Sequence, residues 1–155
     1  MNELNSTPIN VDTAIQFELL KELRGLFVSA ELPFWLRGGW ALDFLLHQLS
    51  RSHSDIDLVM FDKDSAEVHT LLVDQNYVFN RDIGIQMDFS KEHQDISIVY
   101  VAIDKAGFIY TPAIPEWVWL PDALSASQGH LLDLTCPILS AEQLLEEKLS
   151  VEQGT

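Results

Sequence analysis

The chain has 155 residues, 47% of them hydrophobic, and its formal net charge is −15. This acidic excess argues against a nucleic-acid duplex or an anionic membrane surface as the partner, because like charges repel. It favours metal ions and cationic small molecules, unless the charge serves solubility alone.

Length and composition indicate one domain over residues 1–155 with a packed core. No stretch approaches the roughly 20 apolar residues of a membrane span. The polar segment Met1–Thr7 lacks the basic-then-apolar order of a signal peptide. Cys136 is the only cysteine, which excludes an internal disulfide and favours a reducing compartment. We therefore expect a cytoplasmic protein.

Hydrophobic spacing predicts the first elements in chain order. A helix starts with Asp12 as its N-cap and ends before Pro33, and residues 34–36 form a short buried strand. A glycine turn at Gly38-Gly39 then leads into a second helix over residues 40–48. Residues 55–61 form the second strand.

The later elements are predicted from capping boxes and β-rich runs. Asp64 with Glu67, and Ser140 with Gln143, each open a helix. The predicted strands and loops follow by residue number: strands over 77–79, 83–89 and 95–103, a hairpin turn at 104–107 into 108–110, and an irregular covering loop over 111–121. Helices that alternate with strands in this way imply an α+β domain with helices packed on a mixed sheet.

Two carboxylates are expected on one face of the second strand. Side chains alternate along a strand, so Asp55 and Asp57 share a face. Acids are depleted from strands, and a pair of them suits a divalent cation that also binds substrate phosphates. The alternative is a solvated strand end with no ligand.

The glycine pair Gly38-Gly39 follows a strand and precedes a helix. Backbone amides without a Cβ can approach a phosphate closely, and a helix N-terminus favours an anion. An ordinary strand-to-helix turn would have the same residues, but the pair stands shortly before the two aspartates. Together these residues indicate a nucleoside triphosphate with magnesium.

Two-metal phosphoryl chemistry requires a third carboxylate from a neighbouring strand. Asp95 opens the next long strand and is the favoured candidate; Asp88, one strand earlier, is the rival. Arg51 and His53 precede Asp55, and either could contact the nucleotide or simply order the loop. We expect Asp43 to hold Arg51 or His53 in place rather than to act in catalysis.

Trp117 and Trp119 stand in the irregular segment. They could stack on a base or a sugar, but aromatic residues in such segments more often fill the core.

The run Gly38-Gly39-Trp40-Ala41-Leu42-Asp43 and the run Arg51-x-His53-x-Asp55-Ile56-Asp57-Leu58 resemble small antibiotic nucleotidyltransferases of the polymerase-β-like superfamily. The similarity is greatest to the aminoglycoside 2''-adenylyltransferase and lincosamide nucleotidyltransferase groups. The segment 137–145 also resembles the family's closing segment.

This resemblance implies a polymerase-β-like nucleotidyltransferase fold and Mg²⁺-dependent transfer of a nucleoside monophosphate, usually AMP from ATP, to a hydroxyl. It implies that Asp55 and Asp57 bind magnesium, that Asp95 completes the triad and helps deprotonate the hydroxyl, and that Gly38 and Gly39 bind the triphosphate. The acceptor is expected to be a small, cationic, antibiotic-like compound, which would confer antibiotic resistance.

Two departures from the family separate this chain from its relatives. Asp95 is followed by Ile-Ser-Ile-Val, where lincosamide enzymes tend to have a histidine-proline pair. The chain also ends at Thr155, where relatives usually continue with helices, so we expect a short or missing C-terminal extension and a homodimer that completes the pocket. The alternatives are an antitoxin that modifies a partner protein and a non-catalytic nucleotide or ligand binder.

Overall fold

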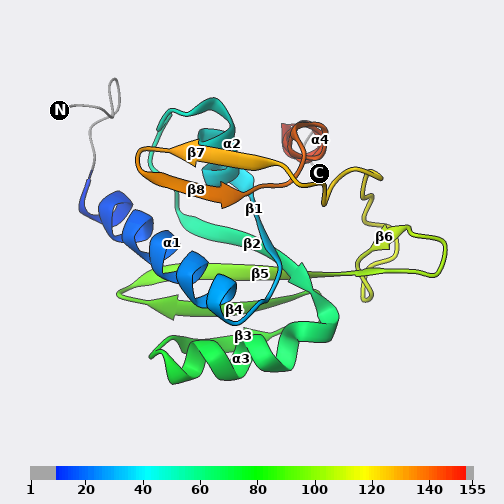
Figure 1. Cartoon of the computed structure of the whole chain (residues 1–155), viewed down its shortest axis with the longest axis horizontal. Coiled ribbons are helices and arrows are strands. Elements are labelled where there is room, and N and C mark those ends of the chain that lie inside the picture. Colours follow the sequence, from blue (N-terminus) through cyan, green and yellow to red (C-terminus); the bar gives the residue numbers. More distant parts are fainter. Residues whose placement is uncertain (1–9, 153–155) are drawn as a thin grey trace.

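The computed structural model describes residues 10–152 (Figure 1). The helices are α1 (Val11–Ser29), α2 (Gly38–Leu46), the 3-10 turn η1 (Asp62–Asp64), α3 (Ser65–Asp74) and α4 (Ala141–Glu152). The strands are β1 (Phe34–Arg37), β2 (Asp55–Phe61), β3 (Val78–Asp82), β4 (Gln86–Lys91), β5 (Gln94–Ile103), β6 (Ile109–Tyr110), β7 (Gln128–Leu131) and β8 (Leu134–Pro137). No helix in this described range is long and apolar enough to cross a bilayer.

The main sheet is mixed, as the sequence predicted. Its strand order is β1-β2-β5-β4-β3, and the short β6 pairs with the far end of β5. Strands β2 and β5 are parallel, whereas the other pairs are antiparallel. The parallel pair forms because the chain leaves β2, runs through α3 and the β3–β4 hairpin, and returns beside β2 as β5.

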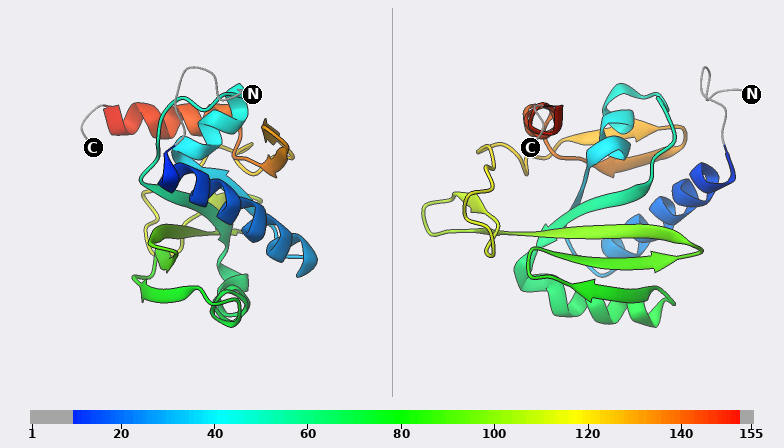
Figure 2. Two further views of the ribbon diagram at one scale, coloured as in Figure 1. Left: turned by 90° about the vertical axis from the view of Figure 1, so that its left-hand side faces the viewer. Right: turned by 180° about the vertical axis from the view of Figure 1, so that it is seen from behind.

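Helices α1 and α3 cover one face of this sheet, and α4 lies on its other side (Figure 2). The even-numbered residues of β2 are fully buried, because apolar side chains on that face pack into the core: Ile56, Leu58 and Met60. Leu19, Leu20 and Leu23 of α1 belong to the same cluster. The odd-numbered residues of β2 lie on the opposite face and include the two acids Asp55 and Asp57.

Helix boundaries differ from the predictions where capping decides them. Asn10, rather than Asp12, caps α1, since its side chain accepts a hydrogen bond from the Thr13 backbone N–H. Helix α2 begins at Gly38 itself, so the glycines form its first turn and not a separate loop. Asp64 precedes α3 without a side-chain cap, so the capping box expected there is wrong. Ser140 does cap α4, through Gln143 N–H.

The β7–β8 hairpin was not predicted. It packs on α2, where Gly129 is required because a Cβ there would lie 2.7 Å from Phe44 Cβ. Trp119 fills the core as expected: it is buried, and its indole N–H donates to Thr111 Oγ1 at 2.8 Å.

Candidate active site

The register of β2 and β5 brings the acidic residues to one face of the sheet. Asp55 is the partner of Asp95, and Asp57 is the partner of Ser97. On the other side of β5, Ser97 is the partner of Asp88. Cα partners in a sheet point to the same face. Both candidates for the third carboxylate therefore lie on the face of Asp55 and Asp57, which we call the carboxylate face.

A row of polar residues with an arginine at each end crosses this face and spans five strands. Arg37 of β1 is the partner of Asp57. Ser97 follows on β5, then Asp88 on β4 and Arg81 on β3. The arginines at the two ends of the row leave the centre, around Asp55 and Asp57, with excess negative charge.

Asp57 is the most strongly perturbed acid of the site. Burial and the neighbouring Asp55 carboxylate raise its pKa from 3.8 to about 6, although Arg37 opposes the change. A carboxylate that is buried beside a like charge binds a proton or a metal cation more readily. This pair therefore has the electrostatics of a cation site.

Asp88 and Asp95 differ in how their charge is compensated. Asp88 accepts hydrogen bonds from Arg81 Nε at 2.6 Å, Ser97 Oγ at 2.9 Å and Gln86 Nε2 at 2.8 Å. Burial alone would raise the pKa of Asp88, but these hydrogen bonds lower it. Asp95 is exposed beside Asp55. Asp95 is thus the acid that keeps its acceptor oxygens available for a ligand.

A cavity of about 350 Å³ opens on this face. Its lining includes Asp55, Asp95, Asp88, Ser97 and Arg81. These residues come from four strands, so the cavity follows from the register described above. Its volume is at the lower end for small-molecule sites.

Gly38 and Gly39 each pack closely against a different site residue. Gly38 has φ +70°, and a Cβ there would lie 2.8 Å from Asp57 Oδ2. At Gly39 a Cβ would lie 2.7 Å from His53 Cε1 and closer still to Nδ1. Any side chain at either position would displace a predicted site residue.

His53 is buried against Gly39 and is held by Asp43. His53 Nε2 lies 2.6 Å from Asp43 Oδ2, and the Ser50 hydroxyl donates to Asp43 Oδ1 at 2.6 Å. The prediction that Asp43 positions a neighbour is therefore confirmed for His53. Arg51 is exposed, and its guanidinium donates to the Ser52 carbonyl at 3.0 Å.

Sequence analysis missed a buried glutamine that connects both halves of the site. Gln16 Oε1 accepts from the Trp40 indole N–H at 2.7 Å. Its amide nitrogen donates to the His53 carbonyl at 3.1 Å and to Gln94 Oε1 at 2.8 Å. The indole can only donate, so the orientation of the amide is fixed. Gln16 thus links the His53 loop to the strand that starts with Gln94 and Asp95.

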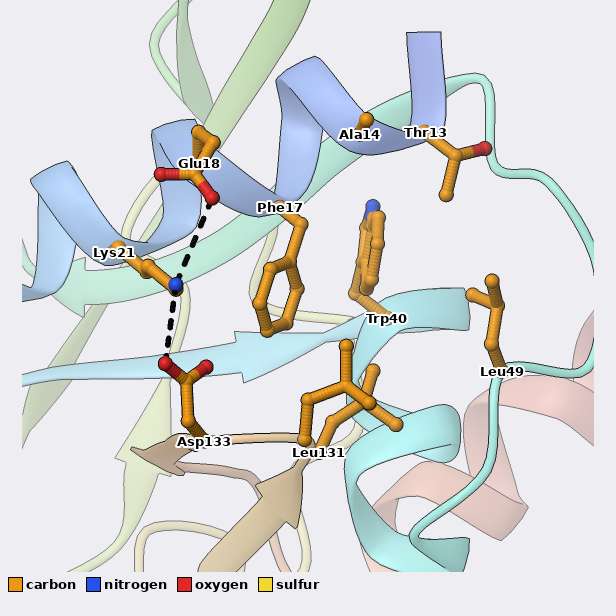
Figure 3. A pocket seen from close by; sticks show the side chains of 10 residues that line it. Thr13, Ala14, Phe17, Glu18, Lys21, Trp40, Leu49, Leu131 and Asp133 are labelled. Atoms are coloured by element: carbon orange, nitrogen blue, oxygen red, sulfur yellow. Dashed lines mark hydrogen bonds and ion pairs between the residues drawn. The ribbon is translucent and has the colours of Figure 1, made fainter. Parts of the chain in front are cut away.

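A second pocket borders Trp40 and shares no lining residue with the cavity on the carboxylate face (Figure 3). It has a volume of about 300 Å³ and is walled mainly by Phe17, Trp40, Leu49 and Leu131. Lys21 closes one end through ion pairs with Glu18 and Asp133, drawn as dashed lines. This pocket contains none of Asp55, Asp57 and Asp95, and its two acids, Glu18 and Asp133, are paired with Lys21.

Arg37 also connects the carboxylate face to the C-terminal helix. Its Nε lies 3.4 Å from Glu147 Oε1 of α4. Its Cζ lies 5.4 Å from the centroid of the Trp117 ring, which stacks on Trp119. The chain pattern gave no sign of this contact, because Glu147 is one of many acids on an apparently solvated helix.

The acidic residues fit a magnesium ion in part. Between residues 10 and 152, no group of three or more His, Cys, Asp or Glu side chains is placed to hold a metal ion by itself. Protein sites for Mg²⁺ commonly supply only one or two carboxylates, and substrate phosphates supply further ligands. The pair Asp55 and Asp57 satisfies that requirement.

Comparison with known proteins gives a family match over most of the chain. Residues 19–152 match the profile of the family described as aminoglycoside-2''-adenylyltransferase. A 2''-aminoglycoside nucleotidyltransferase of Klebsiella pneumoniae is 32% identical over 57 residues, which cover 37% of this chain and 32% of the relative. This alignment therefore spans about a third of that relative's length.

Two solved structures have similar folds. The lincosamide antibiotic adenylyltransferase LnuA, determined with lincomycin bound, is 27% identical with a TM-score of 0.70; the match covers 84% of this chain and 83% of that one. ANT(2'')-Ia in complex with adenylyl-2''-tobramycin gives a TM-score of 0.75 at 17% identity, over 91% of this chain and 78% of that one. The mixed sheet with its helices is therefore the fold of these nucleotidyltransferases.

Proposed function

Because the chain belongs to the aminoglycoside-2''-adenylyltransferase family, we propose that it transfers a nucleoside monophosphate, AMP from ATP, to a hydroxyl of a small cationic antibiotic. The observation that carries this proposal is the carboxylate face: Asp55 and Asp57 share it with Asp95, and Asp57 lies beside Gly38. Both named structural relatives are antibiotic-modifying adenylyltransferases or their product complexes.

Asp55 and Asp57 would hold Mg²⁺, with Asp95 as the third acid. The ion would supply positive charge to the triphosphate and to the attacking and leaving oxygens. The amide groups of Gly38 and Gly39 at the start of α2 would donate to phosphate oxygens. His53 keeps this turn in place through its contact with Gly39, and Arg51 stands nearby to pair with the triphosphate.

The reaction is an in-line displacement at the α-phosphorus. The acceptor hydroxyl oxygen forms a new P–O bond, the bond to pyrophosphate breaks, and the hydroxyl proton passes to a base. Asp95 is the best-placed base, because its carboxylate has no cationic partner among the described residues, whereas Asp88 is paired with Arg81. Catalysis would depend on positioning and electrostatics, without a covalent enzyme intermediate.

A pyrophosphate-release screen tests the proposal. Purified protein is combined with magnesium, each NTP, and a panel of aminoglycosides and lincosamides. Release that depends on one nucleotide and one acceptor class is expected, and Asp57→Asn should abolish it. Asp62→Asn is the matched control, since Asp62 is exposed past the far end of β2. Equal loss in both variants, or no release with any pair, would contradict the proposal.

The oligomer is a separate part of this proposal. Leu145 and Leu149 of α4 are 56% and 44% exposed, and Val118 is 62% exposed. Exposed apolar side chains on and near α4 favour a homodimer through this surface. The nucleotide would come from the cytoplasm. Sedimentation of the wild type and of Leu145→Glu tests it: a monomer in both proteins would refute the dimer and leave the chemistry unaffected.

A further inference from the structure

The contact between Arg37 and α4 has the composition of a cation-binding site that is already filled. A carboxylate and the face of an indole ring together bind ammonium and guanidinium groups. Glu147 supplies the carboxylate and Trp117 supplies the ring. We call these two residues the cation cage. The group inside it belongs to the chain itself, the guanidinium of Arg37.

The cage is held together without help from Arg37. Gln143 is fully buried; its Oε1 accepts from the Leu120 backbone N–H at 2.8 Å, and its Nε2 lies 3.4 Å from Glu147 Oε2. Trp117 stacks on Trp119 at a centroid distance of 5.5 Å and an interplanar angle of 13°. Both walls would therefore stay in place if Arg37 left.

Arg37 fills the cage poorly. Its Nε faces Glu147 Oε1 at 3.4 Å, but this nitrogen is buried and forms no hydrogen bond with a described residue. An arginine that matches a carboxylate well forms two parallel hydrogen bonds. A ligand cation that forms such bonds could therefore compete with Arg37 for Glu147.

The cage is adjacent to the proposed reaction centre. Arg37 is the Cα partner of Asp57 on the same face of the sheet. A cation bound between Glu147 and Trp117 would therefore lie next to Asp57. A polyhydroxylated amine held there would present its neighbouring hydroxyls to the metal and the nucleotide.

We propose that the cage formed by Glu147 and Trp117 is the acceptor's ammonium subsite, and that Arg37 occupies it until the acceptor displaces the guanidinium. The inference rests on the proposed function for the identity of the ligand. It adds the residues that select a cationic acceptor, and it assigns Arg37 as an internal competitor.

The test is equilibrium binding of 2-deoxystreptamine, a diaminocyclitol, by calorimetry in the absence of nucleotide and metal. Glu147→Gln should weaken binding about tenfold, a typical effect of losing one charge-assisted contact. Glu146→Gln is the matched control, because Glu146 is the exposed neighbour on the same helix and the charge change is identical. Its affinity should stay within about twofold of the wild type, as expected for a screened surface charge.

Arg37→Gln should tighten binding several-fold, because the competitor is gone. The double variant Arg37→Gln/Glu147→Gln distinguishes binding in the cage from a general attraction of cations by the Asp57 carboxylate. The gain should vanish in the double variant if it comes from the cage. A gain that persists, equal losses in the two glutamate variants, or weaker binding in Arg37→Gln would each overturn the inference. Circular dichroism melts verify that every variant is folded.

The outcomes also separate this inference from the proposed function. Nucleotidyl transfer with unchanged binding in Glu147→Gln would refute the cage and keep the activity. Cage-dependent binding without pyrophosphate release from any acceptor would keep the cation site and refute the transferase.

Discussion

Gly39→Ala tests how closely the Gly38-Gly39 turn packs against His53. A Cβ at this position would lie 2.7 Å from His53 Cε1. The ring cannot move aside freely, since Asp43 binds it at 2.6 Å and the Trp40 ring packs against it at a centroid distance of 4.9 Å. Overpacking of a filled site costs about 1–3 kcal/mol. For a chain of this length, that corresponds to a fall in Tm of roughly 2–12 °C.

Gly25→Ala is the matched control. Gly25 lies inside α1, and a Cβ there would have no neighbour within 4 Å. Alanine is preferred to glycine in a helix by roughly 0.5–1 kcal/mol, so this variant should melt about 1–4 °C higher than the wild type. The same substitution should thus have opposite signs at the two positions.

Thermal melts and a double-mutant cycle with His53→Ala complete the experiment. Removal of the imidazole should abolish most of the cost of Gly39→Ala, with a coupling energy of about 1 kcal/mol or more. If Gly39→Ala changes Tm no more than Gly25→Ala does, or lowers stability equally without His53, the contact with His53 does not restrict position 39.

Three further predictions concern charge and positioning. Because the pKa of Asp57 is raised from 3.8 to about 6, the folded chain binds more protons than the unfolded chain between these values, so ligand-free stability should fall as pH rises through about 4 to 6. Asp57→Asn should remove this fall in stability and melt higher than the wild type at pH 7.5. Parallel curves of Tm against pH for the two proteins would refute the contribution of Asp57. Magnesium with ATP should raise the Tm of the wild type by mass action but leave Asp57→Asn unchanged, and an equal rise in both would place the metal elsewhere. Gln16→Met should lower kcat, because it removes the hydrogen bonds that hold the His53 loop and the strand of Asp95. The control Tyr77→Phe removes the hydrogen bond from Tyr77 to Glu22 of α1 and should change stability alone. Equal kcat values for the two variants would refute the positioning role of Gln16.

Local patterns predicted the local parts of the fold well. The alternation in β2, the β-rich run of β5 and the Ser140 cap all depend on residues close in sequence. The pairing of β2 with β5 was suggested only by the need for a third acid. The register that places Asp95 beside Asp55 could not be derived, because it depends on how elements far apart in the sequence pack together.

Residues that act over long sequence distances were missed. Gln16 stands among apolar helix positions, and a polar residue there has no periodic signal of its own. Glu147 was indistinguishable from its acidic neighbours until Arg37 was found beside it. The β7–β8 hairpin contains four-residue strands around a short turn, too brief for alternation to be recognised.

The bond between Gln16 and Gln94 has a consequence for the order of assembly during synthesis. These residues are 78 positions apart, and Asp95 directly follows the second of them. Helix α1 leaves the ribosome before β5, the strand that must pair with β2 and bind Gln16. Closing so long a loop is entropically costly and slow compared with forming a helix or a hairpin. The nascent chain should therefore leave the Gln16 amide without its Gln94 partner, and lack Asp95, until β5 emerges.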